Sequence, residues 1–320
     1  MKLKTYFRAK NLLTTTMFIE QGIHSDNKFW KYLFGSVLIF GASLIGQLPL
    51  LMGVLYETLV NKKTYPNSNA AIMHFLEPNW TLFLLLFSFV FVFLGIYFVL
   101  RNLHHQTLLS IITSRIRIDW KRVFFSFSLW TGFTIASTAV FYFLNPEDFV
   151  VQFQLVPFLI LFGIGLVLFP FQIGCEELFF RGYLMQGFGN LAHNKWFPLL
   201  MTSLIFGLLH LANPEVDKMG YSILIYYIGT GFFLGILTLM DDGMELALGF
   251  HFANNFIGAL LVTSDWSAFQ TYAVLKDISN PSNSLEVLLP VFIIFPTLVV
   301  LFAKRYQWEN WTEKLTGKIS

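Results

Sequence analysis

Charged residues are scarce in this chain of 320 residues. Lys, Arg, Asp and Glu make up 12% of it and hydrophobic residues 55%, whereas an ordinary soluble domain is about 25% charged. The formal net charge is only +2, and Lys and Arg form no dense run. This balance argues against a nucleic acid partner. The composition instead predicts a protein that crosses a lipid bilayer several times.

Cysteine is nearly absent as well. Cys175 is the single one, which excludes an intrachain disulfide framework and a cysteine-rich metal site. Because free cysteine behaves as a small hydrophobic residue, we interpret Cys175 as a buried packing residue. A reactive thiol is the alternative, since the acidic Glu176 follows directly.

Polar interruptions are also few, so long hydrophobic runs dominate the chain. A helix needs about 20 mostly apolar residues to span a bilayer, and open strands cannot satisfy their backbone groups in lipid. The sequence therefore predicts an all-α fold, a polytopic transmembrane bundle of about eight spanning helices. The first run is too long for a cleavable signal peptide and is expected to be retained. The predicted helices cover residues 33–56, 79–100, 123–144, 153–175, 197–212, 221–240, 246–263 and 286–303.

Positive charge predicts how the bundle is oriented, because Lys and Arg are enriched in cytoplasmic loops. They gather in the segment 1–32, in the loop after the second helix and in the tail 304–320. With eight spans these three regions lie on one side. We therefore expect an integral protein of the plasma (inner) membrane with both termini in the cytoplasm. The acidic turn at residues 241–245 goes against the trend, but acidic residues weigh little in this rule.

Two adjacent glutamates and an arginine lie inside the apolar part of the chain, at Glu176, Glu177 and Arg181. An ionisable residue at membrane depth costs about 2.5–3.5 kcal/mol on insertion, so its presence points to a function. Glu177 and Arg181 are four residues apart, share one helix face and are expected to form an ion pair. Glu176 is rotated by about 100° from Glu177. We therefore expect Glu176 to have no partner in its own helix and to face the bundle interior as a free carboxylate.

Two later apolar segments carry His210, His251 and Asn255. His251 and Asn255 are four residues apart, so an imidazole and an amide project from one helix face; Asn254 is the alternative amide. Polar groups on three membrane helices meet only in the bundle interior or in a water-filled cavity. Each residue also has a structural explanation: a helix-end ion pair for Glu177, an interfacial position for His210, an interhelical hydrogen bond for Asn255.

Linear counting places these residues at different depths. Glu176 and His251 fall near the cytoplasmic ends of their predicted helices, whereas His210 lies about 12 residues into its helix, or roughly 18 Å. Their convergence requires a tilt, a shifted helix start or a kink near Pro170. All three remain open at the level of sequence.

Three motifs together resemble a known family. They are Glu-Glu-x-x-x-Arg-Gly at 176–182, Phe-x-x-x-His at 206–210 and His-x-x-x-Asn at 251–255. In this order, each on its own apolar segment, they resemble the CAAX-protease and bacteriocin-processing family (CPBP, also called the Abi family), which is related to the type II CAAX prenyl endopeptidase. The resemblance covers about residues 170–260, and no defining position departs from it.

The resemblance implies a membrane-embedded endopeptidase that hydrolyses a peptide bond of a membrane-associated or prenylated-type substrate. Glu176 matches the position that activates water, and His210 matches its partner. His251 and Asn255 match the pair that holds the oxyanion. Peptide hydrolysis needs a base for water and donors for the oxyanion, and this set supplies both. The supporting positions of the family fall on Glu177 and Arg181.

The resemblance also implies partners and a division of the chain. The expected partners are a peptide or protein substrate at the membrane and the lipid bilayer itself. A catalytic helical core similar to CAAX proteases is expected at residues 151–303, preceded by N-terminal transmembrane helices at 33–150. A cytoplasmic N-terminal segment at 1–32 and a cytoplasmic tail at 304–320 flank them.

A metal ion is one question that the residues leave open. Glu176, His210 and His251 make a set of two histidines and one carboxylate, which suits zinc with an open fourth position. The family is often described as metalloproteases. No His-Glu-x-x-His motif is present, however, and a glutamate base with His and Asn donors needs no metal. A zinc site and a metal-free site are both compatible with the sequence.

Two functions without proteolysis compete with this interpretation. One is a membrane scaffold or bacteriocin-immunity-type protein that retains the fold; it would need Glu177 and Arg181 for folding but tolerate loss of Glu176. The other is a transporter with an intramembrane proton site, since Glu and His also build proton relays. The transporter is disfavoured because the sequence has no visible inverted-repeat symmetry.

Overall fold

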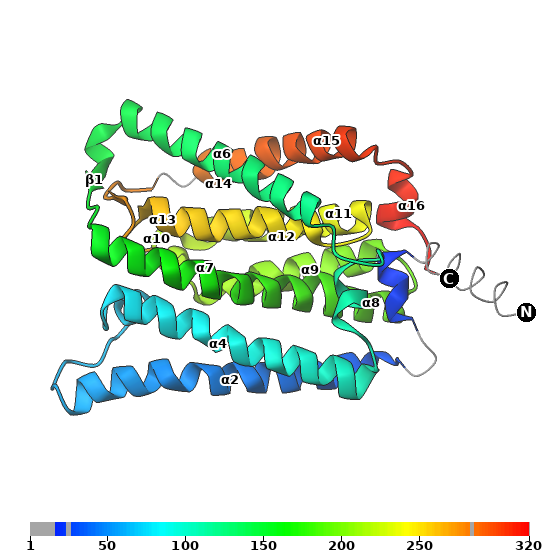
Figure 1. The fold of residues 1–320 in the computed structure, drawn as a ribbon, viewed down its shortest axis with the longest axis horizontal. Helices are drawn as coiled ribbons and strands as arrows, with labels where there is room; N and C mark the ends of the chain where they lie inside the picture. The colour runs from blue at the N-terminus through cyan, green and yellow to red at the C-terminus, as the bar shows by residue number, and fades with distance from the viewer. Residues whose placement is uncertain (1–16, 24–26, 282–284, 320) are drawn as a thin grey trace, which may run out of the picture.

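Long helices running side by side make up most of the computed structural model, which describes residues 17–23, 27–281 and 285–319 (Figure 1). Six helices in this part of the chain are long and apolar enough to cross a membrane. The fold is therefore a mostly helical bundle of the multi-pass membrane type. The six helices are Phe29–Leu59, Pro78–His104, Trp120–Leu144, Leu155–Ala192, Pro214–Asp241 and Val287–Tyr306.

The prediction of eight spanning helices is wrong, because the fifth and seventh candidates form shorter helices. The fifth is α9 (Trp196–Leu209), which one 3-10 turn extends to Ala212. It ends there because Asn213 is extended, with φ −71° and ψ 143°, the conformation preferred by a residue before proline. The seventh candidate consists of α12 (Glu245–Phe252), the π-helical turn η7 (Ala253–Ile257) and α13 (Gly258–Leu261).

The helix that carries the glutamates is longer than the predicted 153–175. α7 (Leu155–Glu177) passes through Pro170 and continues as the π-helical segment η4 (Leu178–Leu184) and then as α8 (Met185–Ala192). Together these elements form one helix of 38 residues. Glu176 therefore lies in the interior of a long helix and not at its end.

This extension removes the mismatch in depth that the sequence suggested. At 1.5 Å per residue, Glu176 lies about 24 Å from the end of α8, and His210 lies about 21 Å from the start of α9. A short connection joins α8 to α9, and the two helices pack against each other. Both side chains are thus at a similar distance from the same end of the bundle.

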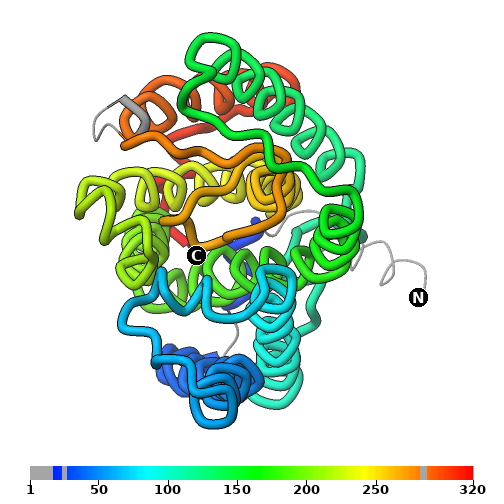
Figure 2. Tube along the Cα trace, turned by 90° about the vertical axis from the view of Figure 1, so that its left-hand side faces the viewer, coloured from blue at the N-terminus to red at the C-terminus, as the bar shows by residue number. Residues whose placement is uncertain are grey.

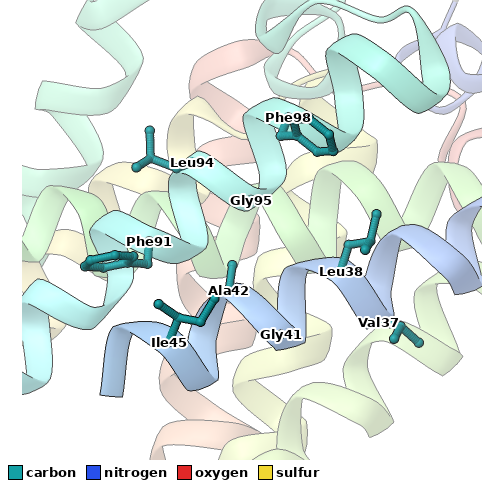
Figure 3. A pocket seen from close by; sticks show the side chains of 9 residues that line it. All are labelled: Val37, Leu38, Gly41, Ala42, Ile45, Phe91, Leu94, Gly95 and Phe98. Carbon is teal, nitrogen blue, oxygen red and sulfur yellow. The ribbon is translucent and has the colours of Figure 1, made fainter. Parts of the chain in front are cut away.

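α2 (Phe29–Leu59) and α4 (Pro78–Val99) form a pair along one side of the bundle, and α4 also packs on α7 (Figure 1). Gly46 lies so close to Ser88 that a Cβ atom would come within 2.6 Å of the Ser88 carbonyl oxygen. Small residues permit this close approach of helices in membranes. A shallow groove between the two helices is lined by apolar residues only (Figure 3), as suits a surface in lipid.

The other half of the bundle surrounds the short helices. α6 (Trp120–Leu144) packs on α12, and α11 (Ile223–Asp241) packs on α9. The main hydrophobic core lies between these elements and η4, and includes Phe180, Phe206 and Phe250. The remaining helical elements are η1 (Phe18–Gly22), α3 (Asn69–Met73), η2 (Leu100–His104), α5 (Leu108–Ile112), η3 (Pro146–Asp148), α10 (Pro214–Met219), η6 (Gly220–Ser222), α14 (Leu285–Leu289), η8 (Pro290–Ile294), α15 (Phe295–Tyr306) and α16 (Trp311–Thr316).

A small sheet departs from the predicted all-α fold. β1 (Phe149–Val151) pairs antiparallel with β3 (Leu275–Asp277), which pairs in parallel with β2 (Val262–Thr263). Figure 2 shows the segment after α13 crossing one end of the bundle. The pairing satisfies backbone groups of connecting segments that no helix satisfies.

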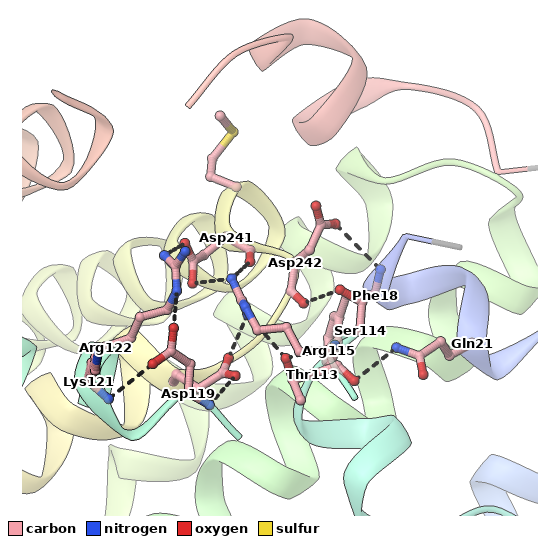
Figure 4. Close-up of polar contacts among 12 residues, drawn as sticks. Phe18, Gln21, Thr113, Ser114, Arg115, Asp119, Lys121, Arg122, Asp241 and Asp242 are labelled. Atoms are coloured by element: carbon pink, nitrogen blue, oxygen red, sulfur yellow. Dashed lines mark hydrogen bonds and ion pairs between the residues drawn. The ribbon is translucent and has the colours of Figure 1, made fainter. Parts of the chain in front are cut away.

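Basic side chains pair with all three acids of the turn 241–245, at the opposite end of the bundle (Figure 4). Arg115 lies 3.1 Å from Asp241 and 3.0 Å from Glu245, and Arg122 lies 2.6 Å from Asp241. The acidic turn therefore adds no unpaired negative charge to this end. The network also fixes the connection before α6 against the turn between α11 and α12.

The two described ends of the chain meet at the same turn. The Phe18 backbone N–H of η1 donates to Asp242 at 3.5 Å, and Lys314 of α16 lies 2.6 Å from the same carboxylate. η1 and α16 thus lie at one end of the bundle, as their colours in Figure 1 show. Residues 1–16 and 24–26 of the predicted N-terminal segment 1–32 lie outside the described residues.

Candidate active site

Glu176 has a partner in its own helix, contrary to the prediction. The Gln172 side chain, one turn earlier in α7, donates a hydrogen bond from Nε2 to Oε1 of Glu176. The Glu176 side chain is 17% exposed, and Gln172 is 4% exposed. Gln172 is the one uncharged polar side chain within α7. Its spacing of four residues from Glu176 is a signal that the sequence contained.

Glu177 forms the predicted ion pair and also a second contact. Nη1 of Arg181 lies 3.1 Å from Oε1 of Glu177, which confirms the pairing expected from their spacing. Nδ1 of His251 donates to the same oxygen at 2.8 Å. The Arg181 guanidinium also lies over the ring of Phe206, 4.3 Å from its centroid, a cation–π contact. The buried pair thereby joins α7 and η4 to α9 and α12.

His251 stands between the two glutamates. Its Nε2 lies 3.6 Å from Oε2 of Glu176, while its Nδ1 is held by Glu177. Because Nδ1 carries the donated proton, Nε2 has a free lone pair in the neutral ring. When both nitrogens are protonated, the formal charges of the two glutamates, Arg181 and His251 sum to zero. Such a balance offsets part of the cost of burying ions.

His210 is oriented by two contacts. Its Nδ1 donates to the backbone carbonyl of Phe206 at 2.7 Å, and its ring stacks on Tyr227 with centroids 4.3 Å apart. Nε2 is therefore the nitrogen left free for chemistry. The Phe206 ring touches both histidines, with centroids 4.7 Å from His210 and 6.2 Å from His251. Within residues 17–23, 27–281 and 285–319, no hydrogen bond or ion pair joins His210 to Glu176 directly.

Asn255, not Asn254, is the amide next to the histidine. Nδ2 of Asn255 lies 3.5 Å from Nε2 of His251 and donates to Oε1 of Gln172 at 3.2 Å. Asn254 instead accepts a hydrogen bond from Nε1 of Trp130 at 3.2 Å. The two neighbouring amides therefore face different groups.

Two π-helical segments hold these side chains. η4 begins directly after Glu177 and contains Arg181, and η7 contains Asn254 and Asn255. π-helical turns are rare and occur frequently at functional sites. The wider turn shifts the residues that follow it around the helix axis, and hydropathy does not reveal it.

Within the described ranges of the chain, the structure leaves the zinc site predicted at Glu176, His210 and His251 without a supporting cluster. Among the described residues, no group of three or more His, Cys, Asp and Glu side chains is placed to hold a metal ion. Each histidine does donate its Nδ1 proton to an oxygen atom, a feature of metal-binding histidines and of catalytic ones alike. The zinc site stays a prediction.

Helices of a multi-pass membrane protein thus enclose a buried cluster of carboxylates, imidazoles and amides. Residues 153–257 match the family model of the Rce1-like type II CAAX prenyl endopeptidases. This region is accordingly an Rce1-like domain of the CPBP family, which confirms the resemblance seen in the three motifs. All six candidate site residues lie within it.

Comparison with other proteins adds one relative. The chain is 27% identical over 286 residues to the uncharacterized protein YyaK of Bacillus subtilis (strain 168), covering 88% of this chain and 95% of the relative. The similarity extends well beyond the Rce1-like domain. No solved structure matches the chain.

Proposed function

We propose that this protein is a membrane-embedded endopeptidase that hydrolyses a peptide bond of a membrane-associated or prenylated-type substrate. One observation carries the proposal. Inside the Rce1-like domain, His251 is held at Nδ1 by Glu177 and turns Nε2 toward Glu176 at 3.6 Å. A carboxylate base and an imidazole that can donate from Nε2, placed side by side in a buried site, suit the activation of water and the stabilisation of the oxyanion that its attack forms.

In the proposed reaction, Glu176 takes a proton from water, with His210 as its partner, and the water oxygen attacks the scissile carbonyl carbon. His251, through a protonated Nε2, and Asn255, through Nδ2, donate to the oxyanion that forms. Collapse of the intermediate breaks the C–N bond. The leaving amine then receives the proton held by Glu176. Each of these residues is a proposed catalytic residue.

Glu177 and Arg181 have a supporting part in this proposal. Glu177 fixes the tautomer and the ring orientation of His251 through Nδ1, and Arg181 balances the charge of Glu177. Because both side chains are buried, the pair also holds the helix that carries Glu176.

We further infer a location and a division of the chain that extend this proposal. In this proposal the protein lies in the plasma (inner) membrane with both termini in the cytoplasm. The orientation is supported by Arg115 and Arg122, which lie at the same end of the bundle as η1 and α16. The division has a cytoplasmic segment at 1–32, transmembrane helices at 33–150, the catalytic core at 151–303 and a cytoplasmic tail at 304–320.

A matched pair of glutamate variants tests the endopeptidase. Glu176→Gln is expected to abolish cleavage while the protein accumulates normally in the membrane. Glu57→Gln, which makes the same change at a glutamate of α2 paired with Lys63, is expected to cleave normally. The measurement is the set of new N-termini in membrane-associated proteins, compared by mass spectrometry between cells that express each variant and cells that lack the protein.

The same comparison separates the competing functions. If Glu176→Gln and His210→Ala keep full biological activity at normal abundance, the endopeptidase is refuted and the scaffold or immunity-type protein is favoured. If uncleaved substrate accumulates in both variants, the substrate is identified in the same experiment.

A further inference from the structure

Four hydrogen bonds connect an indole in α6 to the Glu176 carboxylate. Nε1 of Trp130 donates to Oδ1 of Asn254 at 3.2 Å, and Nδ2 of Asn254 donates to Oδ1 of Asn255 at 3.1 Å. Nδ2 of Asn255 donates to Oε1 of Gln172 at 3.2 Å, and Nε2 of Gln172 donates to Oε1 of Glu176. The chain of bonds crosses α6, η7 and α7.

The two ends of this chain fix the direction of every bond in it. An indole nitrogen can only donate and an ionised carboxylate can only accept. Asn254 must therefore turn its oxygen toward Trp130, which leaves its NH₂ group for the next amide. Asn255 and Gln172 are oriented in the same way: each accepts with its amide oxygen and donates with its NH₂ group. Every donor therefore points toward Glu176. Hydrogen bonds aligned in this way polarise one another.

The chain of bonds distinguishes the two oxygens of Glu176. Oε1 accepts from Gln172, while Oε2 faces Nε2 of His251 at 3.6 Å. Trp130 is 7% exposed and Gln172 is 4% exposed, so water has little access to replace either bond. The carboxylate is thereby held in one orientation, in which Oε2 faces His251.

We propose that Trp130, Asn254 and Gln172 are positioning residues that orient the Glu176 carboxylate to activate water. Gln172 acts by direct contact, and Trp130 and Asn254 act through Asn255 and Gln172. This inference rests on the proposed endopeptidase function. None of the three is assigned a contact with the attacking water or the scissile carbonyl; Gln172 contacts Oε1 of Glu176, the oxygen turned away from His251. Asn255 belongs both to this series of hydrogen bonds and to the proposed oxyanion site, because its NH₂ group has two hydrogens. One hydrogen is donated to Gln172, and the other points toward Nε2 of His251.

Variants that remove single donors test the inference in the full-length purified protein. Gln172→Met keeps the length of the side chain but donates nothing, so kcat is expected to fall about 10–100-fold with KM within about twofold. Trp130→Phe removes the indole N–H and retains an aromatic ring, so kcat is expected to fall about 3–10-fold. The matched control is Trp308→Phe, since Nε1 of Trp308 donates to Asp241 outside the site; it is expected to leave kcat unchanged.

The double variant distinguishes a connected chain from separate packing effects. If Trp130 acts only through the chain, Trp130→Phe combined with Gln172→Met has the kcat of Gln172→Met alone, because the link is already broken. Effects that multiply, or single variants that match the wild type, overturn the inference. Glu176→Gln is assayed beside them. If the wild-type protein has no peptidase activity, the proposed function is refuted. If the wild type is active and Glu176→Gln is inactive, the function holds and the other variants test the series of hydrogen bonds alone.

Discussion

Nδ1 of His251 lies 2.8 Å from Oε1 of Glu177, although the two residues are 74 positions apart in sequence. This contact gives Glu177 a place in the site as well as in the ion pair with Arg181. It also fixes which nitrogen of His251 is turned toward Glu176. The two adjacent glutamates therefore have different environments, and their replacement should have different consequences.

Replacing Glu177 should destabilise the protein. Glu177→Gln leaves the fully buried Arg181 without its counter-charge, and breaking a buried ion pair on one side costs about 3–5 kcal/mol. We expect a lower apparent melting temperature in detergent and lower abundance in membranes. Glu176→Gln, by contrast, should keep the abundance and lose the activity.

A double variant is the control for this prediction. Glu177→Gln combined with Arg181→Met removes both charges and should recover part of the stability lost in the single variant. Equal melting temperatures for the wild type and Glu177→Gln would show that the pair contributes little to folding.

The stacking partner of His210 should matter through its ring and not through its hydroxyl. Tyr227→Leu removes the aromatic surface 4.3 Å from the imidazole, so His210 loses one of two contacts that orient it. We expect kcat to fall about tenfold or more, since positioned acid–base groups contribute about 10²–10⁴-fold. Tyr227→Phe keeps the ring and loses the hydroxyl, which accepts a 3.4 Å bond from Asn213 and also interacts with Glu215. The prediction fails if both variants lose the same activity.

Helical spacing made part of this site predictable. The Glu177–Arg181 pair and the shared face of His251 and Asn255 follow from residues four apart, a local rule that tertiary structure did not override. The same rule connects Gln172 to Glu176, although the uncharged amide of Gln172 carries a weaker signal in an apolar run than a charge does. Trp130 is found only in three dimensions, because the Asn254 that it contacts lies 124 positions along the chain.

The helix limits were harder to predict for a physical reason. Hydropathy ends a helix where charges begin, so the predicted fourth helix stopped just before Glu176. In the structure His251, Arg181 and Gln172 compensate those charges, and the helix continues to Ala192. The contact from His251, 74 positions from Glu177, is a tertiary effect and has no signature in a local window.

Chelation tests the predicted zinc site. A glutamate base with His251 and Asn255 as donors needs no metal ion, so we expect the purified protein to keep its activity in excess chelator. Elemental analysis of the same sample measures whether zinc is bound. Activity that is lost on chelation and restored by zinc would contradict this expectation and would favour the zinc site predicted at Glu176, His210 and His251.

The single cysteine makes the orientation of the chain measurable. Cys175 is 1% exposed and contacts the Phe89 carbonyl, so the unmodified protein should not react with a membrane-impermeant thiol reagent. Lys62→Cys lies in the exposed loop after α2, and Glu309→Cys lies in the exposed loop before α16. If the end with η1 and α16 faces the cytoplasm, Lys62→Cys is labelled in intact cells. Glu309→Cys is then labelled only after the membrane is opened, and the reverse pattern would invert the proposed topology.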